Sequence, residues 1–179
     1  GGIFFLLSIP LMIFISFLIL VSSGGPVIFK QKRLGWDGRV FIIYKFRTMV
    51  FMEKGYKKTR QAEQNDKRVT KFGKLLRRSS LDELPQIINV LQGRMSIVGP
   101  RPHALDHEET FKKQVKGYAR RYKVKPGITG WAQVNDLRGQ INNVEDIRRR
   151  VQHDLFYIEN WSIWFDLRII ITTILKVFF

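Results

Sequence analysis

The chain has 179 residues, a formal net charge of +16 and no cysteine. Its length suits one domain with one sizeable core, and the absence of cysteine excludes disulfides and thiolate chemistry. The excess of Lys and Arg predicts a phosphate-bearing or polyanionic partner, which leaves nucleic acid, an anionic lipid surface and a phosphorylated substrate open.

An apolar segment opens the chain, because residues 3–21, "IFFLLSIPLMIFISFLILV", contain no charge. At about 1.5 Å of rise per residue, this segment is long enough for a helix that crosses a membrane. Pro10 removes a backbone donor near its middle and predicts a kink or break. Two alternatives stay open: a spanning helix that tolerates Pro10, and a re-entrant helix that bends there and leaves by the same face. The next loop, "FKQKRLGWDGR", is basic and is expected on the cytoplasmic side.

Short segments follow the apolar one. The stretch "SSGGP" at 22–26 predicts a turn, and residues 27–29 and 40–46 are either paired strands or simply extended chain. The basic tract 53–78 predicts a loop and then a short helix at 70–78.

The second half of the chain alternates helical patterns with one glycine-rich stretch. Residues 84–91 predict a buried helix and 104–122 a charged one, whereas the glycines and proline of 123–135 predict a rigid loop. Apolar spacing predicts another helix at 145–161. The final segment, 161–179, is apolar but contains two tryptophans and Lys176. It is therefore either a helix in the headgroup region of a membrane or a C-terminal core helix.

The stretch "RRSSLDELPQ", residues 77–86, sets Asp82 beside Glu83 in a strongly basic chain. One interpretation is local: Ser80 as N-cap and Glu83 three residues later would form a capping box. Pro85 opposes it, because it would be the fifth helical residue, whereas Asp82 as the cap would place Pro85 in the first turn. The other interpretation is chemical. A helix N-terminus and arginines suit phosphate, a divalent cation can bridge two carboxylates, and an aspartate can act as a covalent nucleophile.

With these residues in view, the chain resembles the monotopic phosphoglycosyltransferases, a family of bacterial sugar transferases, and among them the undecaprenyl-phosphate glucose phosphotransferases. The resemblance covers nearly the whole chain. It depends on an apolar first helix with a central proline and on four motifs: "YKFRTM" at 44–49, "LRRSSLDELPQIINVLQGRMSIVGPRP" at 76–102, "PGITGWAQV" at 126–134 and "DLFYIENWSIWFDLRI" at 154–169.

The resemblance implies an α/β fold, with a small mixed α/β catalytic body, an N-terminal re-entrant membrane helix and interfacial amphipathic helices. The expected division is a re-entrant helix at 1–25 and a catalytic domain at 26–179 that ends in an interfacial helix. The expected location is the bacterial inner membrane, with the active site on its cytoplasmic face. Many glucose-type relatives have further spanning helices upstream. Many relatives also have serine directly before the membrane proline, where this chain has Ile9.

The resemblance also implies a reaction. A sugar-1-phosphate, with glucose-1-phosphate preferred, would pass from a UDP-sugar to undecaprenyl phosphate, giving undecaprenyl-diphosphate sugar and UMP. This would be the first membrane step of exopolysaccharide or related glycan synthesis. By the same likeness, Asp82 is the nucleophile that forms an aspartyl phosphosugar in a ping-pong cycle. Glu83 is its partner, either in coordinating Mg²⁺ together with Asp82 or in deprotonating the lipid phosphate.

Further site residues are carried over from the family. Arg77 and Arg101 would bind substrate phosphate, and Asp154 would complete the acidic site. A loop would hold the nucleotide through Pro126, Gly127, Thr129 and Gly130. The rival hypothesis is a basic membrane-bound protein that binds anionic lipid or RNA without catalysis. Aromatic residues do not interleave with the basic tract, which opposes a nucleic-acid partner. The oligomeric state stays open.

Overall fold

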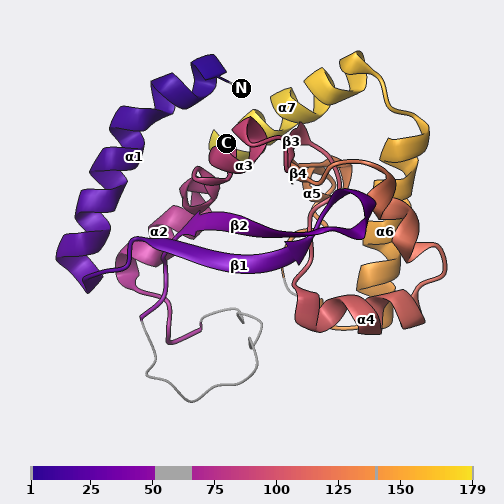
Figure 1. Cartoon of the computed structure of the whole chain (residues 1–179), viewed down its shortest axis with the longest axis horizontal. Helices are drawn as coiled ribbons and strands as arrows, with labels where there is room; N and C mark the ends of the chain where they lie inside the picture. Colours follow the sequence, from indigo (N-terminus) through magenta and orange to yellow (C-terminus); the bar gives the residue numbers. More distant parts are fainter. Residues whose placement is uncertain (1, 51–65, 140, 179) are drawn as a thin grey trace.

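The computed structural model describes residues 2–50, 66–139 and 141–178. Within these ranges it is a mixed α/β fold, as predicted, in which helices predominate and short strands form two small sheets (Figure 1). In chain order the elements are α1 (Gly2–Ser23), β1 (Ile28–Leu34), η1 (Trp36–Gly38), β2 (Val40–Phe46), α2 (Lys71–Arg78), η2 (Leu81–Glu83), α3 (Gln86–Leu91), β3 (Ser96–Val98), α4 (Leu105–Gln114), η3 (Tyr118–Lys123), β4 (Gly127–Thr129), α5 (Trp131–Val134), α6 (Val144–Glu159) and α7 (Ile163–Phe178).

The first helix, α1, stands at one side of the molecule and is largely exposed (Figure 1). Its segment Phe5–Ser23 is long and apolar enough to cross a membrane, by length and composition. The helix continues through Pro10 with a curved axis and no break (Figure 1). Since proline has no N–H, one turn of the helix lacks a backbone bond. Nearby, the Ser8 hydroxyl donates to the Phe5 carbonyl at 2.8 Å.

The C-terminal half of α1 packs into the protein body. Ile15 and Ile19 are buried in one core cluster with Phe46 of β2 and Leu76 of α2. The residues that flank the acidic pair, Leu81 and Leu84, pack against the same cluster. Burying branched aliphatic side chains of this size stabilises a fold by about 1.5–3 kcal/mol each. The apolar helix therefore shares its core with the segment that carries the acidic pair.

Arg47, directly after β2, fastens the end of α1. Its guanidinium group donates to the carbonyl oxygens of Ser23 at 2.7 Å and Gly25 at 2.6 Å, and to that of Gly24. These carbonyls lie at and just beyond the end of the helix, where helical donors run out. Arg47 itself is buried, so its side chain is fixed in place by these bonds although Gly24 and Gly25 are exposed.

Strands β1 and β2 form an antiparallel hairpin, from the pair Ile28–Phe46 to the pair Leu34–Val40. This confirms the paired-strand alternative for residues 27–29 and 40–46. Alternate residues of β2 face the body, and the buried Phe41 and Ile43 pack with Met95. Lys45 is the next residue in that alternation, so this strand directs a cation inward.

The second sheet is a parallel pair of short strands, β3 and β4, joined at Ser96–Gly127 and Val98–Thr129. The two backbones approach so closely that a Cβ on Gly127 would lie 2.1 Å from the Gly99 nitrogen. Glycine is therefore required at this crossing. The segment 123–135, predicted as a rigid loop, instead contains β4 and the short helix α5.

The predicted helices were mostly confirmed. Those expected at 70–78 and 145–161 correspond to α2 and α6, and that at 84–91 to α3. The helix expected at 104–122 was wrong as one piece, because Gly117 at φ 81° separates α4 from η3. The loop expected in the first part of the tract 53–78 falls mainly on residues outside the described ranges.

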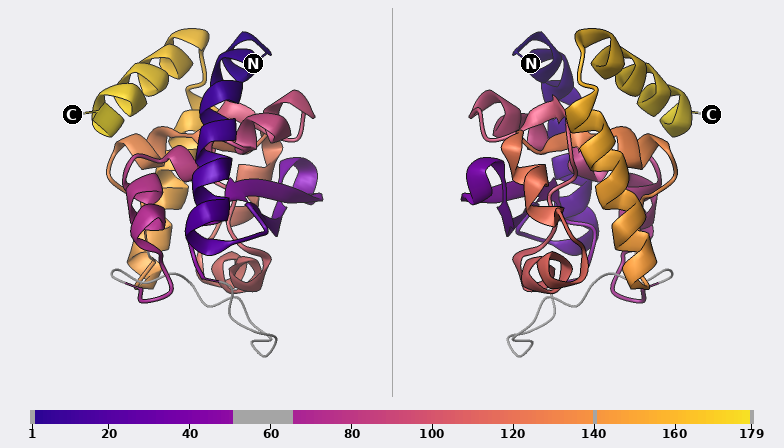
Figure 2. Two further views of the ribbon diagram at one scale, coloured as in Figure 1. Left: turned by 90° about the vertical axis from the view of Figure 1, so that its left-hand side faces the viewer. Right: turned by 90° about the vertical axis from the view of Figure 1, so that its right-hand side faces the viewer.

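The last helix, α7, lies across the end of the molecule away from α4 (Figures 1 and 2). One side packs into the body, where Ile169 is fully buried against Val98, Val134 and Tyr157. The other sides expose apolar residues: Ile163, Trp164, Leu167, Ile171, Ile174 and Leu175. The core-helix alternative is therefore confirmed for one side of α7, whereas its position in the headgroup region of a membrane stays a prediction.

Candidate active site

The acidic pair lies in η2, a single 3₁₀ turn between α2 and α3. The capping-box interpretation was wrong: Ser80 adopts the left-handed conformation at φ 57° and makes no side-chain cap bond. Asp82 is not a helix cap either, because α3 begins at Gln86 after Pro85. The Ser80 hydroxyl instead accepts a hydrogen bond from Arg138 Nη2 at 2.8 Å. Partners from distant parts of the chain bind these side chains in place of the local capping bonds that the sequence pattern predicts.

Glu83 is held by two cations. Lys45 Nζ donates to its Oε1 at 2.7 Å, and Arg101 donates to Oε1 at 2.5 Å and to Oε2 at 3.0 Å. Burial opposes ionisation of Glu83, but the charges of Arg101 and Lys45 outweigh it and hold its pKa well below the usual range. Burial lowers the pKa of Lys45, against the charge of Glu83. Because Arg101 keeps its charge and contacts both oxygens, Glu83 stays ionised.

Asp82 has a different environment from its neighbour. Its side chain is half-buried, and no hydrogen bond reaches its carboxylate from the described parts of the chain. Burial, followed by the charge of Glu83, raises the pKa of Asp82, while Lys45, Arg101 and Arg77 oppose this shift. The two adjacent carboxylates are therefore driven apart in pKa, and the oxygens of Asp82 are free to react or to bind a cation.

Arg77 projects from the last turn of α2. Its Nε donates to the Thr48 hydroxyl at 2.8 Å, and its charge is among those that act on Asp82. Helix α2 lies close to the segment that follows β2, because a Cβ on Gly73 would lie 2.1 Å from the Thr48 carbonyl oxygen. Arg77, Arg101, Asp82 and Glu83 are thus brought together.

Asp154 is bound to a separate arginine and not to the acidic pair. It accepts a 2.7 Å bond from Arg121 Nε, and both side chains are almost fully buried. Arg121 in turn donates to the Arg101 carbonyl at 2.5 Å and to His103 Nδ1 at 3.1 Å. Within the described ranges, no hydrogen bond or ion pair joins Asp154 to Asp82. Its connection to the site is therefore through the backbone at Arg101.

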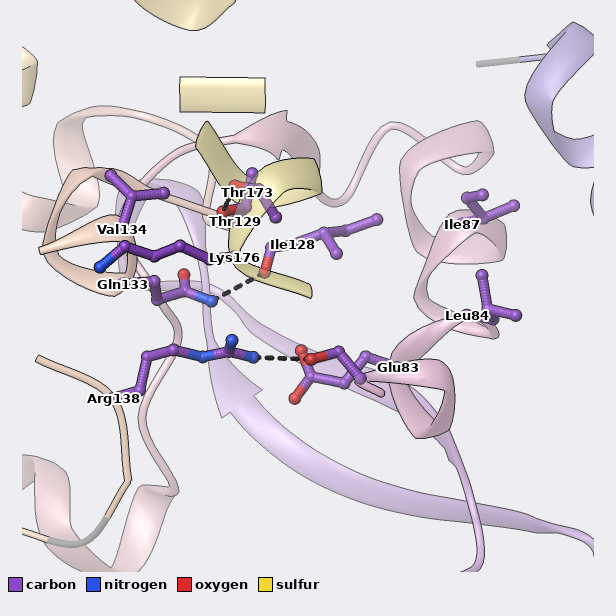
Figure 3. Close-up of a pocket in the computed structure, with 11 residues that line it drawn as sticks. Glu83, Leu84, Ile87, Ile128, Thr129, Gln133, Val134, Arg138, Thr173 and Lys176 are labelled. Carbon is purple, nitrogen blue, oxygen red and sulfur yellow. Dashed lines mark hydrogen bonds between the residues drawn. The ribbon is translucent and has the colours of Figure 1, made fainter. Parts of the chain in front are cut away.

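The four predicted nucleotide-loop residues separate into two groups. Thr129 lines a cavity of about 150 Å³ that Glu83 also lines (Figure 3). The other three take part in close backbone packing. The Pro126 carbonyl accepts from Ser96 N at 2.8 Å, and a Cβ on Gly127 or Gly130 would lie 2.1 or 2.2 Å from Gly99. Pro10 lies within α1, in the apolar segment that is expected to enter the membrane.

Three cations near the site were not assigned from the sequence. Lys45 binds Glu83, while Arg138 and Lys176 line the cavity. Lys45 could have been noticed, because it continues the inward alternation of Phe41 and Ile43 on β2. Arg138 and Lys176 carry no such local signal, since each reaches the site from a distant part of the chain.

The donor set fits Mg²⁺ through Asp82 more readily than through Glu83. Within the described ranges, no group of three or more His, Cys, Asp or Glu side chains could hold a metal. Both Glu83 oxygens already accept bonds from cations. Mg²⁺ is commonly bound by one or two carboxylates together with waters and substrate phosphates. The free oxygens of Asp82 fit such a shared site.

Comparison with known proteins identifies the family. A model of the family described as bacterial sugar transferase matches residues 1–179. The chain belongs to the bacterial sugar transferase family. It is 54% identical over 173 residues to the UDP-glucose:undecaprenyl-phosphate glucose-1-phosphate transferase of Escherichia coli (strain K12), covering 97% of this chain and 37% of the relative.

Two further relatives of this sugar transferase differ in their named sugar. The protein of Xanthomonas campestris pv. campestris, named for the same glucose reaction, is 52% identical over 94% of this chain and 35% of its own length. An Aeromonas hydrophila protein is named as a UDP-N-acetylgalactosamine-undecaprenyl-phosphate N-acetylgalactosaminephosphotransferase. It is 42% identical over 92% of this chain and 38% of its own length. The chain thus spans little more than a third of the length of these relatives.

Proposed function

We propose that this chain transfers a sugar-1-phosphate from a UDP-sugar to undecaprenyl phosphate, producing undecaprenyl-diphosphate sugar and UMP. One observation carries the proposal: the two adjacent carboxylates have different environments. Asp82 accepts no hydrogen bond within the described ranges, whereas Lys45 and Arg101 bind Glu83 and keep it ionised. The names of the relatives support the same substrates, and the greater similarity to the glucose-type proteins favours glucose.

The first half-reaction would be carried out by Asp82. A carboxylate oxygen attacks the sugar-linked phosphorus of the donor, and the bond from that phosphorus to the bridging oxygen breaks. The electron pair leaves with the bridging oxygen as UMP, and an aspartyl phosphosugar remains. Arg77 and Arg101 lie close enough to act electrostatically on Asp82, so they are placed to stabilise the charge on the phosphoryl oxygens.

The second half-reaction would release the sugar to the lipid. A phosphate oxygen of undecaprenyl phosphate attacks the same phosphorus, and the bond to Asp82 breaks to restore its carboxylate. A phosphate monoester has its second pKa near 6, so the acceptor is already mostly dianionic at neutral pH. The depressed pKa of Glu83 makes it a weak proton acceptor. A role in charge balance and positioning is therefore favoured over deprotonation of the lipid phosphate.

Mg²⁺ is part of the proposal. Asp82 would hold it together with the donor phosphates, and Glu83 would need to exchange a present cation contact to join it. When bound, the ion neutralises phosphoryl charge during the transfer. The protein side chains orient the donor and keep the reacting carboxylate unpaired.

The apolar surfaces of α1 and α7 support a lipid acceptor. We propose that α1 dips into the cytoplasmic leaflet of the bacterial inner membrane as a re-entrant helix, and that α7 lies at its surface. The apolar length of α1, its curvature at one end, and the apolar exterior of α7 support this arrangement. Basic side chains around the site would attract both anionic substrates and anionic lipid.

The function is tested by measuring UMP released from UDP-glucose and other UDP-sugars by detergent-solubilised protein, with Mg²⁺ and with EDTA. We expect Mg²⁺-dependent release that is lost in Asp82→Asn, because the amide is a poor nucleophile, and retained in the exposed control Lys30→Ala. Without acceptor, intact-mass analysis should detect a phosphosugar adduct at Asp82. Normal release by Asp82→Asn would refute the nucleophile. Tight RNA binding without turnover of any UDP-sugar would favour the non-catalytic alternative.

A further inference from the structure

The cavity beside Glu83 has no part in the attack of Asp82 on the donor phosphorus. Its volume is about 150 Å³. One wall comes from η2 and α3, and the opposite wall from β4, α5 and α7 (Figure 3). The cavity therefore lies between η2, which carries the acidic pair, and α7, which has the apolar exterior. Any ligand that it binds should suit both the charged groups of the site and an apolar surface.

The walls of the cavity are mainly apolar. Four branched aliphatic side chains form them: Leu84, Ile87, Ile128 and Val134. In Figure 3, Leu84 and Ile87 lie on one side and Ile128 and Val134 on the other. Burying a hydrocarbon group here would stabilise the complex in proportion to the apolar surface removed from water, by about 0.8 kcal/mol for each CH₂.

Most of the hydrogen-bonding groups on Gln133, Thr129 and Thr173 are already engaged. Gln133 Nε2 donates to the Ile128 carbonyl at 3.1 Å. Its Oε1 is buried and has no hydrogen-bond partner within the described ranges, so it is the one acceptor in these walls that is left unpaired. The hydroxyls of Thr129 and Thr173 bond each other at 2.7 Å, and Thr173 donates to the Ile169 carbonyl at 2.7 Å. A nucleobase or a sugar would leave several polar groups unpaired here, at a cost of about 1–3 kcal/mol each.

Two cations line the cavity together with Glu83. Arg138 donates to the Ser80 hydroxyl and has no carboxylate partner within the described ranges. Lys176 pairs at 2.6 Å with Asp136, whose side chain is 81% exposed. An ion pair this exposed contributes little, so Lys176 can exchange it for a phosphate. An apolar interior with cations in its lining is complementary to a phosphate attached to a hydrocarbon.

Helix α7 connects the cavity to the apolar exterior. Thr173 and Lys176 of this helix line the cavity, whereas its neighbouring residues Ile174 and Leu175 are exposed. A chain that lies along the apolar side of α7 would therefore need to pass around only one helix to enter the cavity.

We propose that this cavity binds the isoprenyl unit next to the phosphate of undecaprenyl phosphate. Leu84, Ile87, Ile128 and Val134 surround its carbons, and Arg138 and Lys176 bind its phosphate beside the Asp82–Glu83 turn. This subsite rests on the proposed function, and assigns its second substrate mainly to residues outside the site predicted from the sequence, with Ile128 of the predicted nucleotide loop among them. The donor nucleotide would then bind outside the cavity, and Thr129, which lines it, would contact the acceptor and not the nucleotide.

Two variants test the subsite in the full detergent-solubilised chain. Ile87→Phe fills the cavity, with exposed Ile97→Phe as its matched control, and Arg138→Ala removes an exposed cation, with exposed Arg94→Ala as its control. Steady-state rates with undecaprenyl phosphate in micelles and UDP-glucose give the KM of each substrate. First-turnover UMP release without acceptor isolates the donor step, and the melting temperature of each variant reports folding.

We expect the KM for undecaprenyl phosphate to rise about tenfold or more in both variants, which is the effect of losing two buried CH₂ groups or one phosphate contact. First-turnover UMP release and the donor KM should stay within about twofold of the wild type. A rise in the donor KM alone would show that the cavity holds the nucleoside and would overturn the proposal, as would unchanged kinetics in Arg138→Ala. Absence of UMP release by the wild type would instead refute the proposed function.

Discussion

The ion pair between Lys45 and Glu83 gives a prediction that tests how the site is held. The pair spans 2.7 Å, with side-chain exposures of 18% for Lys45 and 10% for Glu83. At an effective dielectric constant of about 20, two charges at this separation attract by about 6 kcal/mol, most of which desolvation offsets. A hydrogen bond to a charged group has a net value of about 1.5–3 kcal/mol. Glu83 keeps Arg101 in a Lys45 variant, so its charge is not left unpaired.

We therefore expect Lys45→Met, which keeps the length of the side chain, to lower the free energy of unfolding by about 1.5–3 kcal/mol. For a chain of this size that corresponds to a Tm decrease of about 3–12 °C. Lys30→Met, on the exposed side of the same hairpin, should change Tm by less than about 2 °C. Thermal unfolding in one detergent, followed by tryptophan fluorescence, measures all variants.

A double-variant cycle separates the pair from other effects of the substitution. In a Glu83→Gln background, Lys45→Met should cost clearly less than in the wild type, because its charged partner is gone. Equal losses in the two backgrounds, or a Lys45→Met protein that melts with the wild type, would refute the reasoning. First-turnover UMP release by Lys45→Met should fall at least about tenfold if Glu83 positions the reacting turn.

Three further predictions concern the supports of the site. Gly73→Ala should destabilise the protein, because the new Cβ would lie 2.1 Å from the Thr48 carbonyl oxygen. Alanine in place of glycine normally stabilises a helix by about 1 kcal/mol, so an increase in Tm would contradict this close approach of α2. Asp154→Asn should cost about 3–5 kcal/mol, since it leaves Arg121 charged and buried, and a denaturation midpoint equal to that of the wild type would exclude this. Burial, followed by the charge of Arg121, holds the pKa of His103 well below its usual value, so the unfolded chain binds more protons below about pH 6.5. Stability should therefore decrease as pH falls from 7 to 5, and His103→Gln should lose less Tm over that range; equal losses would show that His103 does not contribute.

Elements with a strong local pattern could be predicted from the sequence. Short apolar runs on either side of a turn allowed the β1–β2 hairpin as one of two alternatives. Apolar spacing indicated α6, whose start is fixed by a capping box between Asn143 and Asp146. The helix expected at 104–122 failed because one glycine in a left-handed conformation outweighs good spacing on both sides. The short parallel strands were missed, since three residues give no measurable period.

The site was predicted in part. Asp82 and Glu83 were adjacent in the sequence, and the family motifs brought Arg77 and Arg101 into consideration. The partners of Glu83 come from positions 38 and 18 residues away in the chain, which no local pattern relates to it. For the same reason the capping box looked plausible: its residues were present, but tertiary ion pairs bind the glutamate more strongly than a backbone N–H would. Roles for Asp154 and the nucleotide loop stay predictions.

The attachment of α1 has a consequence for attempts to obtain a soluble enzyme. Deleting the first 22 residues would remove Ile15 and Ile19 from the cluster that Leu81 and Leu84 also contact. Deleting one residue more would also remove Ser23, which accepts a hydrogen bond from Arg47. The remaining protein would expose the apolar side chains of this cluster, against which Leu81 of η2 and Leu84 pack beside Asp82 and Glu83. Improving solubility by truncation is thus expected to disorder the very residues that would carry the reaction, whereas polar substitutions on the exposed side of α1, such as at Phe17 or Val21, leave that cluster intact.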